Sequence, residues 1–190
     1  MHDVFFPRRR AIWQPVRRLS RADVPELYLP WLLDVSSLTQ RTVAACAGRF
    51  QVLVLAQAWA RPLPDERRRL RLREGRAALI RQVQLLCDGR PWVYARTVIP
   101  RATLSGRERR LGCLGTRPLG AALFADPTME RDPMEIAQLL PGQTLFDLAV
   151  HGLSATPREI WGRRSVFRLS GKPLLVSEIF LPEISRTPCC

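Results

Sequence analysis

The chain of 190 residues is long enough for one well-filled domain and short for two, so we expect a single domain spanning residues 1–190. Its hydrophobic fraction of 46% and charged fraction of 25% exclude a largely disordered or collagen-like chain. The formal net charge of +13 admits a nucleic-acid partner, whereas the apolar runs are too short for a membrane helix, which needs roughly 20 residues.

The first third of the chain combines short helical patterns with one strand. Apolar residues between 24 and 35 predict a short helix, and Ser37 can cap a second one that follows it. The Val- and Leu-rich segment 51–59 is typical of a strand. Residues 61–74 hold two prolines and a run of charges, which predicts a surface loop.

Two hairpins frame the rest of the chain. Residues 78–86 and 91–100 are predicted to be strands joined by a tight Asp-Gly turn, and residues 165–169 and 174–181 form the second pair. Strand pairs separated by short helices indicate an α+β domain built on an antiparallel sheet.

Helical segments are expected between these hairpins. One lies near Ser105, and another covers residues 119–124 after a proline. Residues 125–159 contain four prolines and helical patterns at 134–140 and 145–153. This stretch is therefore expected to be an insertion made of loops and helices.

The basic charge is carried almost entirely by arginine, since Lys172 is the single lysine among 30 basic residues. The arginines concentrate in segments expected to be loops or termini, including a basic N-terminal arm over residues 1–21. This favours a solvated, arginine-rich surface, because neither a zinc-finger spacing nor a base-stacking aromatic strand accompanies the charge. An arginine-rich RNA-binding protein is the alternative, and its RNA affinity would depend steeply on salt.

The five cysteines show no paired spacing apart from an adjacent pair at the C-terminus, which predicts reduced thiols in a cytoplasmic protein. The N-terminus also lacks the apolar segment of a secretory signal. Cys46 and Cys87 lie in or beside apolar runs, where a free cysteine acts as a small hydrophobic residue. A catalytic cysteine would need a base, and the two histidines are His2 near the terminus and His151 in the expected insertion. We therefore expect neither Cys–His catalysis nor a metal site.

Strand alternation places one charged residue on each of two apolar faces. In the first hairpin, Arg81 shares a face with three aliphatic side chains, whereas the opposite face carries glutamines and is expected to be wetter. In the last strand, Glu178 lies between Val176 and Phe180, an unfavourable position for a carboxylate. A buried charged group must form an ion pair, lose its charge, or serve a function such as binding a ligand.

These two charges admit two interpretations. They can form a structural ion pair, or one strand can be an edge strand whose faces are assigned wrongly. Alternatively, they face an enclosed pocket in which Arg81 anchors a substrate carboxylate and Glu178 forms hydrogen bonds or handles a proton. The residues alone leave both interpretations open.

Five motifs in order along the chain resemble those of bacterial chorismate pyruvate-lyases: D-G-x-P-W, R-T-V-I-P, T-L-S-G, P-L-G, and W-G-R-R-S followed by S-G-K-P-L-L. They lie within residues 85–106, 114–124 and 160–182, and weaker similarity extends over 30–41. Five ordered motifs make the resemblance specific, and it favours the functional interpretation of the two charges.

The resemblance implies an antiparallel sheet of about six strands with two helical flaps over an internal ligand cavity. It implies a carbon–oxygen lyase that converts chorismate to 4-hydroxybenzoate and pyruvate, the first step that supplies the ubiquinone ring. It implies no metal and no cofactor. It further implies a monomer whose partners are the small-molecule substrate and product. The pattern of charge and the short apolar runs predict no specific nucleic acid and no membrane insertion.

The resemblance also implies roles for four residues. Arg81 matches the family's ligand-binding arginine, and Glu178 matches its active-site glutamate, so both are candidate catalytic and substrate-binding residues. Leu38 and Leu119 match flap positions that touch the ligand, and Leu38 stands where a relative has methionine, a nearly volume-conserving difference. The arm 1–21 and the tail after residue 186 have no clear counterpart, and residues 125–159 are longer than in the shortest family members.

Three further arginines lie in the matched motifs. Arg96, Arg163 and Arg164 are candidates for binding the second carboxylate of chorismate, or they are outward-facing residues of strands and turns. A non-catalytic ligand-binding domain of the same fold is the other alternative function. Such domains normally follow a DNA-binding domain, for which about 25 N-terminal residues are too few.

Overall fold

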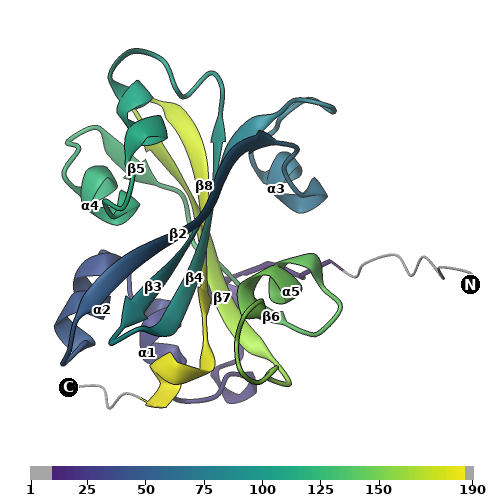
Figure 1. The fold of residues 1–190 in the computed structure, drawn as a ribbon. Helices are drawn as coiled ribbons and strands as arrows, with labels where there is room; N and C mark the ends of the chain where they lie inside the picture. Colours follow the sequence, from purple (N-terminus) through teal and green to yellow (C-terminus); the bar gives the residue numbers. More distant parts are fainter. Residues whose placement is uncertain (1–9, 187–190) are drawn as a thin grey trace, which may run out of the picture.

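The computed structural model describes residues 10–186 and shows an eight-stranded antiparallel sheet with helices on both faces (Figure 1). The strands follow the order β1-β6-β7-β8-β4-β3-β2, and β5 pairs with β7. Their bounds are β1 (Gln14–Pro15), β2 (Phe50–Ala60), β3 (Ala78–Cys87), β4 (Arg90–Pro100), β5 (Met129–Arg131), β6 (Glu135–Leu139), β7 (Ile160–Leu169) and β8 (Lys172–Phe180). Only β1 and β5 are shorter than five residues. The α+β class and the antiparallel sheet are confirmed.

Five α-helices and four 3-10 helices accompany the sheet in this part of the chain. Their bounds are η1 (Val16–Arg18), η2 (Arg21–Asp23), α1 (Leu29–Leu33), α2 (Leu38–Ala45), α3 (Pro64–Arg69), η3 (Gly106–Cys113), α4 (Leu119–Phe124), α5 (Thr144–Val150) and η4 (Pro182–Arg186). Figure 1 shows α2 and α4 on one side of the twisted sheet and α3 and α5 on the other. None of the described helices is long and apolar enough to cross a membrane.

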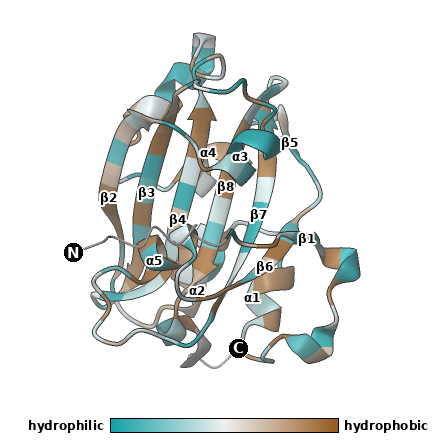
Figure 2. Ribbon diagram, turned by 90° about the vertical axis from the view of Figure 1, so that its right-hand side faces the viewer, coloured by the Kyte–Doolittle hydropathy of each residue, from teal (hydrophilic) through white to brown (hydrophobic). Residues whose placement is uncertain are grey.

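Helices on both faces explain why the central strands are buried along nearly their whole length. Strand β7 is buried at nine of its ten positions, without the alternation of a half-exposed strand. Figure 2 views the sheet from the side of α3 and α5, and hydrophobic segments recur along its strands. The glutamine face of β3 is the wetter one only in part: Gln82 and Leu86 are half-buried, whereas Gln84 is buried, and Gln82 accepts a hydrogen bond from the Tyr94 hydroxyl.

Two segments differ from the sequence expectation. The expected loop 61–74 contains α3, whose Glu66 is buried and accepts a hydrogen bond from the backbone N–H of Leu63 at 2.8 Å. The helical pattern at 134–140 belongs to strand β6, which pairs with β7. Within a run of five residues, the spacing of apolar positions does not distinguish a helix from a strand. The hydrogen-bonded pairing with β7 makes this segment a strand.

The described part of the basic arm belongs to the fold. Strand β1 pairs with β6, and the Arg164 guanidinium lies 4.4 Å from the centre of the Trp13 ring. Residues 1–9, with His2, and the tail 187–190 lie outside the described residues.

The expectation of reduced thiols is wrong for one pair, because Cys46 and Cys87 form a disulfide with their Cα atoms 5.7 Å apart. Cys46 directly follows α2 as its C-cap, and Cys87 is the last residue of β3. The pairing of β2 with β3 sets Phe50 opposite Cys87, which brings the end of α2 close to it. A separation of 41 residues carries no spacing signal, so only the strand register reveals the pair. Cys113 is free and exposed.

Loss of this disulfide is expected to lower stability. Replacing Cys46 and Cys87 with alanine should reduce the free energy of unfolding by about 2–4 kcal/mol, because a closed loop of this length restricts the unfolded chain. Urea denaturation measures the change, and a reductant should reproduce it in the unmodified protein. The Cys113→Ala variant is the control, and equal stability with and without reductant would contradict the prediction.

Candidate functional site

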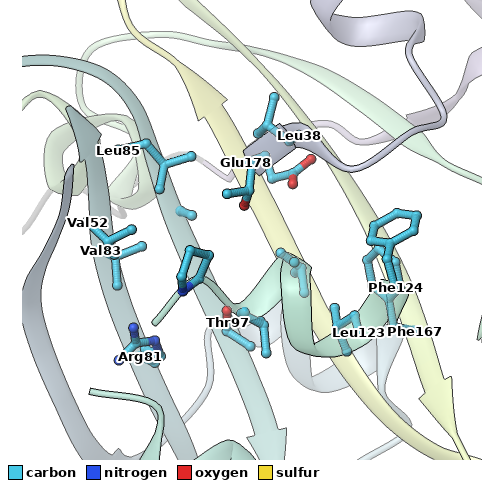
Figure 3. Close-up of a pocket in the computed structure, with 16 residues that line it drawn as sticks. Leu38, Val52, Arg81, Val83, Leu85, Thr97, Leu123, Phe124, Phe167 and Glu178 are labelled. Atoms are coloured by element: carbon cyan, nitrogen blue, oxygen red, sulfur yellow. The ribbon is translucent and has the colours of Figure 1, made fainter. Parts of the chain in front are cut away.

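A largely enclosed cavity lies between the sheet and the helices α2 and α4, which we call the flaps (Figure 3). Its lining is mostly aliphatic and aromatic, with Phe124 and Phe167 among its larger side chains, and two charged residues interrupt it. The four residues singled out from the sequence all line this cavity: Leu38, Arg81, Leu119 and Glu178.

Arg81 reaches the cavity from β3, and only 2% of the residue is exposed. Its guanidinium donates to the Gln57 Oε1 at 3.1 Å and to the carbonyl of Gly115 at 2.8 Å. Burial lowers the pKa of Arg81, and no carboxylate of the described residues offsets this effect. The group is thus a buried cation with neutral partners, which suits it to bind a carboxylate of a ligand.

Glu178 reaches the cavity from β8 and forms an ion pair with Arg163 of β7, directly opposite it in the register. The Arg163 Nε lies 2.6 Å from the Glu178 Oε2. Arg131 provides a second cation nearby: burial lowers its pKa, and the negative charge of Glu178 opposes that shift. The carboxylate therefore lies in a positive environment supplied by β5 and β7.

The structural ion pair between Arg81 and Glu178 is not formed. Arg81 lies opposite Thr97 of β4, and Glu178 lies opposite Ala95 of the same strand. Two strand spacings, about 10 Å, and two residues along the strands therefore separate them. Figure 3 shows the two side chains apart, with the cavity between them. The arrangement can hold a small ring with an anionic group at one end and a hydroxyl group at the other.

The flaps meet over the cavity at a glycine. Leu38 is the first residue of α2, and Leu119 is the first residue of α4. A Cβ atom on Gly120 would lie 3.0 Å from the Thr39 Oγ1 and 3.4 Å from the Ser37 Oγ. The missing side chain is what allows the two helices to approach this closely.

The two remaining candidate arginines do not line the cavity. Arg96 forms a buried ion pair with Glu66 of α3, with nitrogen–oxygen distances of 2.7 and 3.2 Å. Arg164 lies 2.7 Å from a carboxylate oxygen of both Glu135 and Asp65. Glu66 and Asp65 belong to α3, which lies on the other side of the sheet from the flaps (Figure 1), so these side chains occupy the opposite face.

Four arginines therefore depart from the expectation of a solvated arginine surface. Arg81, Arg96, Arg163 and Arg164 are all buried. Carboxylates pair with three of them, and Arg81 is the exception. The burial of these arginines could not be predicted from composition, because the partner of each guanidinium lies on a different strand or helix.

Several further residues that shape the site were not predicted from the sequence. Gln57 and Gly115 hold Arg81, while Arg131 lies beside Glu178. Thr97 and the two phenylalanines line the cavity. A polar residue inside the apolar run of β2 was the available signal for Gln57, which lies opposite Arg81 in the register.

Tyr94 is buried beside the Arg96–Glu66 ion pair, and its surroundings predict that the stability of the protein falls at alkaline pH. Burial raises the pKa of Tyr94 to about 12, helped by the Glu66 carboxylate and opposed by Arg96. The folded state then holds the phenol proton more tightly than the unfolded chain does. The resulting stability, about 3 kcal/mol, is present below about pH 10 and is lost as pH rises through about 12.

Denaturation at a series of pH values measures this loss. The Tyr94→Phe variant has no phenol to titrate, so its stability should fall less between pH 10 and 12 than that of the unmodified protein. Equal losses in the two proteins would contradict the assignment to Tyr94.

A family model described as chorismate lyase matches residues 8–187. Three similar proteins each carry the name "Probable chorismate pyruvate-lyase". The one from Azoarcus sp. (strain BH72) is 48% identical over 84% of this chain and 86% of its own length. Those from Methylococcus capsulatus and Aromatoleum aromaticum are 44% and 45% identical, over 83% and 91% of this chain and 96% and 94% of their own lengths.

Solved structures of lower identity share the fold. A GntR-family transcriptional regulator from Bacillus cereus has a TM-score of 0.53 at 11% identity, covering 74% of this chain and 97% of its own. The C-terminal domain of the histidine utilization repressor from Pseudomonas syringae has a TM-score of 0.52 at 9% identity, covering 75% and 98%. At these identities the likeness concerns the fold alone.

Proposed function

The chain belongs to the chorismate lyase family, and we propose that its cavity converts chorismate to 4-hydroxybenzoate and pyruvate. In this elimination the ether bond between the ring and the enolpyruvyl group breaks, and the ring carbon that bears the hydroxyl loses a proton. The enolpyruvate takes up a proton to become pyruvate. The reaction is redox-neutral, and aromatisation of the ring supplies the driving force.

The observation that carries the proposal is a buried cation without a carboxylate partner, facing a carboxylate across an apolar cavity. Arg81 binds the ring carboxylate through its guanidinium, whose present partners, a side-chain amide and a backbone carbonyl, leave its charge uncompensated. The apolar walls exclude water and strengthen this interaction.

Glu178 binds the other end of the ring. Its carboxylate contacts the ring hydroxyl and assists removal of the adjacent proton. The hydroxyl end of a para-substituted ring points away from the carboxylate end, which agrees with the separation of Glu178 from Arg81 across β4.

The flaps close the site over the ring. Leu38 and Leu119 contact the ligand from the first residues of α2 and α4. An enclosed cavity requires these helices to move before product leaves, so every turnover includes an opening of the flaps.

We further propose that the protein acts as a monomer in the cytoplasm and that its 4-hydroxybenzoate serves as a ubiquinone ring precursor. The disulfide between Cys46 and Cys87 removes the argument for this location that rested on reduced thiols.

The direct test is incubation of the purified protein with chorismate, with 4-hydroxybenzoate and pyruvate followed together. Equimolar appearance of both products supports the proposal. A folded sample that binds 4-hydroxybenzoate but yields neither product would favour the second candidate, a non-catalytic ligand-binding domain. The fold shared with transcriptional regulators is the observation that favours this second candidate.

Removal of the Arg81 charge should abolish most of the activity while the fold persists. The Arg81→Met variant is expected to lose about 100-fold or more in kcat/KM, because the ring carboxylate loses its anchor and its orientation. Steady-state kinetics and thermal denaturation measure activity and folding side by side.

The matched control is Arg117→Met, which removes an exposed arginine from the loop before α4. It should retain nearly full activity. An Arg81→Met protein that is inactive because it is unfolded would indicate a structural role for Arg81 instead.

A side chain at Gly120 should force the flaps apart. The Gly120→Ala variant is expected to bind 4-hydroxybenzoate roughly fivefold more weakly, as overpacking of about 1 kcal/mol implies. Gly112→Ala is the control, because its Cβ would meet only ordinary contacts at 3.7 and 3.9 Å. Quenching of tryptophan fluorescence measures the affinity, and equal binding by both variants would contradict close flap contact.

A further inference from the structure

Arg163 joins the carboxylate of the site to the segment that leads into a flap. It lies on β7, is 1% exposed, and does not line the cavity itself. Its Nε donates to the Glu178 Oε2 at 2.6 Å. One terminal nitrogen donates to the carbonyl of Trp31 at 2.8 Å and also to the carbonyl of Asp34.

These two carbonyls belong to the end of α1 and the residue that follows it. Carbonyl groups at a helix C-terminus lack partners within the helix and must be satisfied from outside. Residues 34–37 connect α1 directly to α2, so the guanidinium fixes the start of the α2 flap. A neighbouring arginine, Arg131, holds the same connection through the carbonyl of Val35 at 3.0 Å.

We propose that Arg163 is a positioning residue, which orients the Glu178 carboxylate and couples it to the α2 flap. This inference rests on the proposed function of Glu178. With Oε2 bound by Arg163, the other carboxylate oxygen of Glu178 is the one presented to the ring hydroxyl. The rigid, planar guanidinium makes both sets of bonds at once, which an amide or an ammonium group cannot do in the same geometry.

The chain supplies a matched control at the next position. Arg164 is also buried and also forms ion pairs with carboxylates, but on the opposite face of the sheet. Arg163→Gln and Arg164→Gln therefore remove comparable charges from the same strand. Only the first of the two variants disturbs the site.

Kinetics of these two variants with chorismate test the proposal. Arg163→Gln should lower kcat by about 100-fold, the cost of a misplaced catalytic group, with a much smaller change in KM. Arg164→Gln should retain kcat within about threefold of the unmodified protein. Equal losses in the two variants would show a general effect of losing a buried ion pair and would overturn the proposal.

A double-mutant cycle shows whether Arg163 acts through Glu178. In a Glu178→Gln protein, adding Arg163→Gln should change kcat by no more than about threefold, since the carboxylate to be positioned is already gone. A full additional loss in that background would overturn the proposal. If Arg163→Gln does not fold, Arg163→Lys keeps the charge and should lose about tenfold in kcat, whereas full activity would count against positioning.

Failure of the proposed function is distinguishable from failure of this inference. If the unmodified protein forms no product from chorismate, the proposed lyase activity is refuted. The affinity for 4-hydroxybenzoate then tests whether Arg163 couples Glu178 to the α2 flap. Arg163→Gln should weaken that affinity at least about fivefold relative to Arg164→Gln, because both the carboxylate and the flap shift. Equal affinities would overturn the proposal.

Discussion

A buried guanidinium group must find acceptors for its N–H groups, and the cavity face of this sheet depends on that constraint. Arg81 finds one acceptor in the carbonyl of Gly115, in the loop before α4. Arg163 finds two in the carbonyls of Trp31 and Asp34, in the segment before α2. Each flap is thus tied at its start to an arginine of the sheet. The same hydrogen bonds that place the flaps also determine where charge lies in the cavity.

The two faces of the sheet use arginine in opposite ways. On the face covered by α3, Arg96 and Arg164 are neutralised by carboxylates, and their ion pairs with Glu66 and Asp65 hold α3 to the sheet. On the cavity face, Arg163 pairs with the carboxylate of Glu178, whereas the hydrogen bonds of Arg81 go to an amide oxygen and a backbone carbonyl. This asymmetry produces a site that is cationic at one end and carries a carboxylate at the other, as an elimination from an anionic ring requires.

The α2 flap is held at both of its ends. The arginine contacts fix the segment before it, and the disulfide between Cys46 and Cys87 fixes its last turn to β3. Close approach to α4 at Gly120 completes the cover. Such an enclosed site keeps water from the reacting ring, and the same enclosure slows exchange of ligand with solvent.

Features that depend on neighbouring residues could be predicted from the amino-acid sequence alone. Alternation along β3 and β8 placed Arg81 and Glu178 on apolar faces, turn residues predicted both hairpins, and the ordered motifs indicated the family. Which side chains contact one another depends instead on how the strands are arranged in space. Strand β4 separates Arg81 from Glu178, and β7 brings Arg163 to Glu178 instead. Likewise, α3, the strand β6 and the disulfide arise from pairing between distant segments. The periodicity of a helix or strand can be read from contiguous residues. The contacts between side chains of different strands depend on the order of the strands in the sheet, and no short segment contains that information.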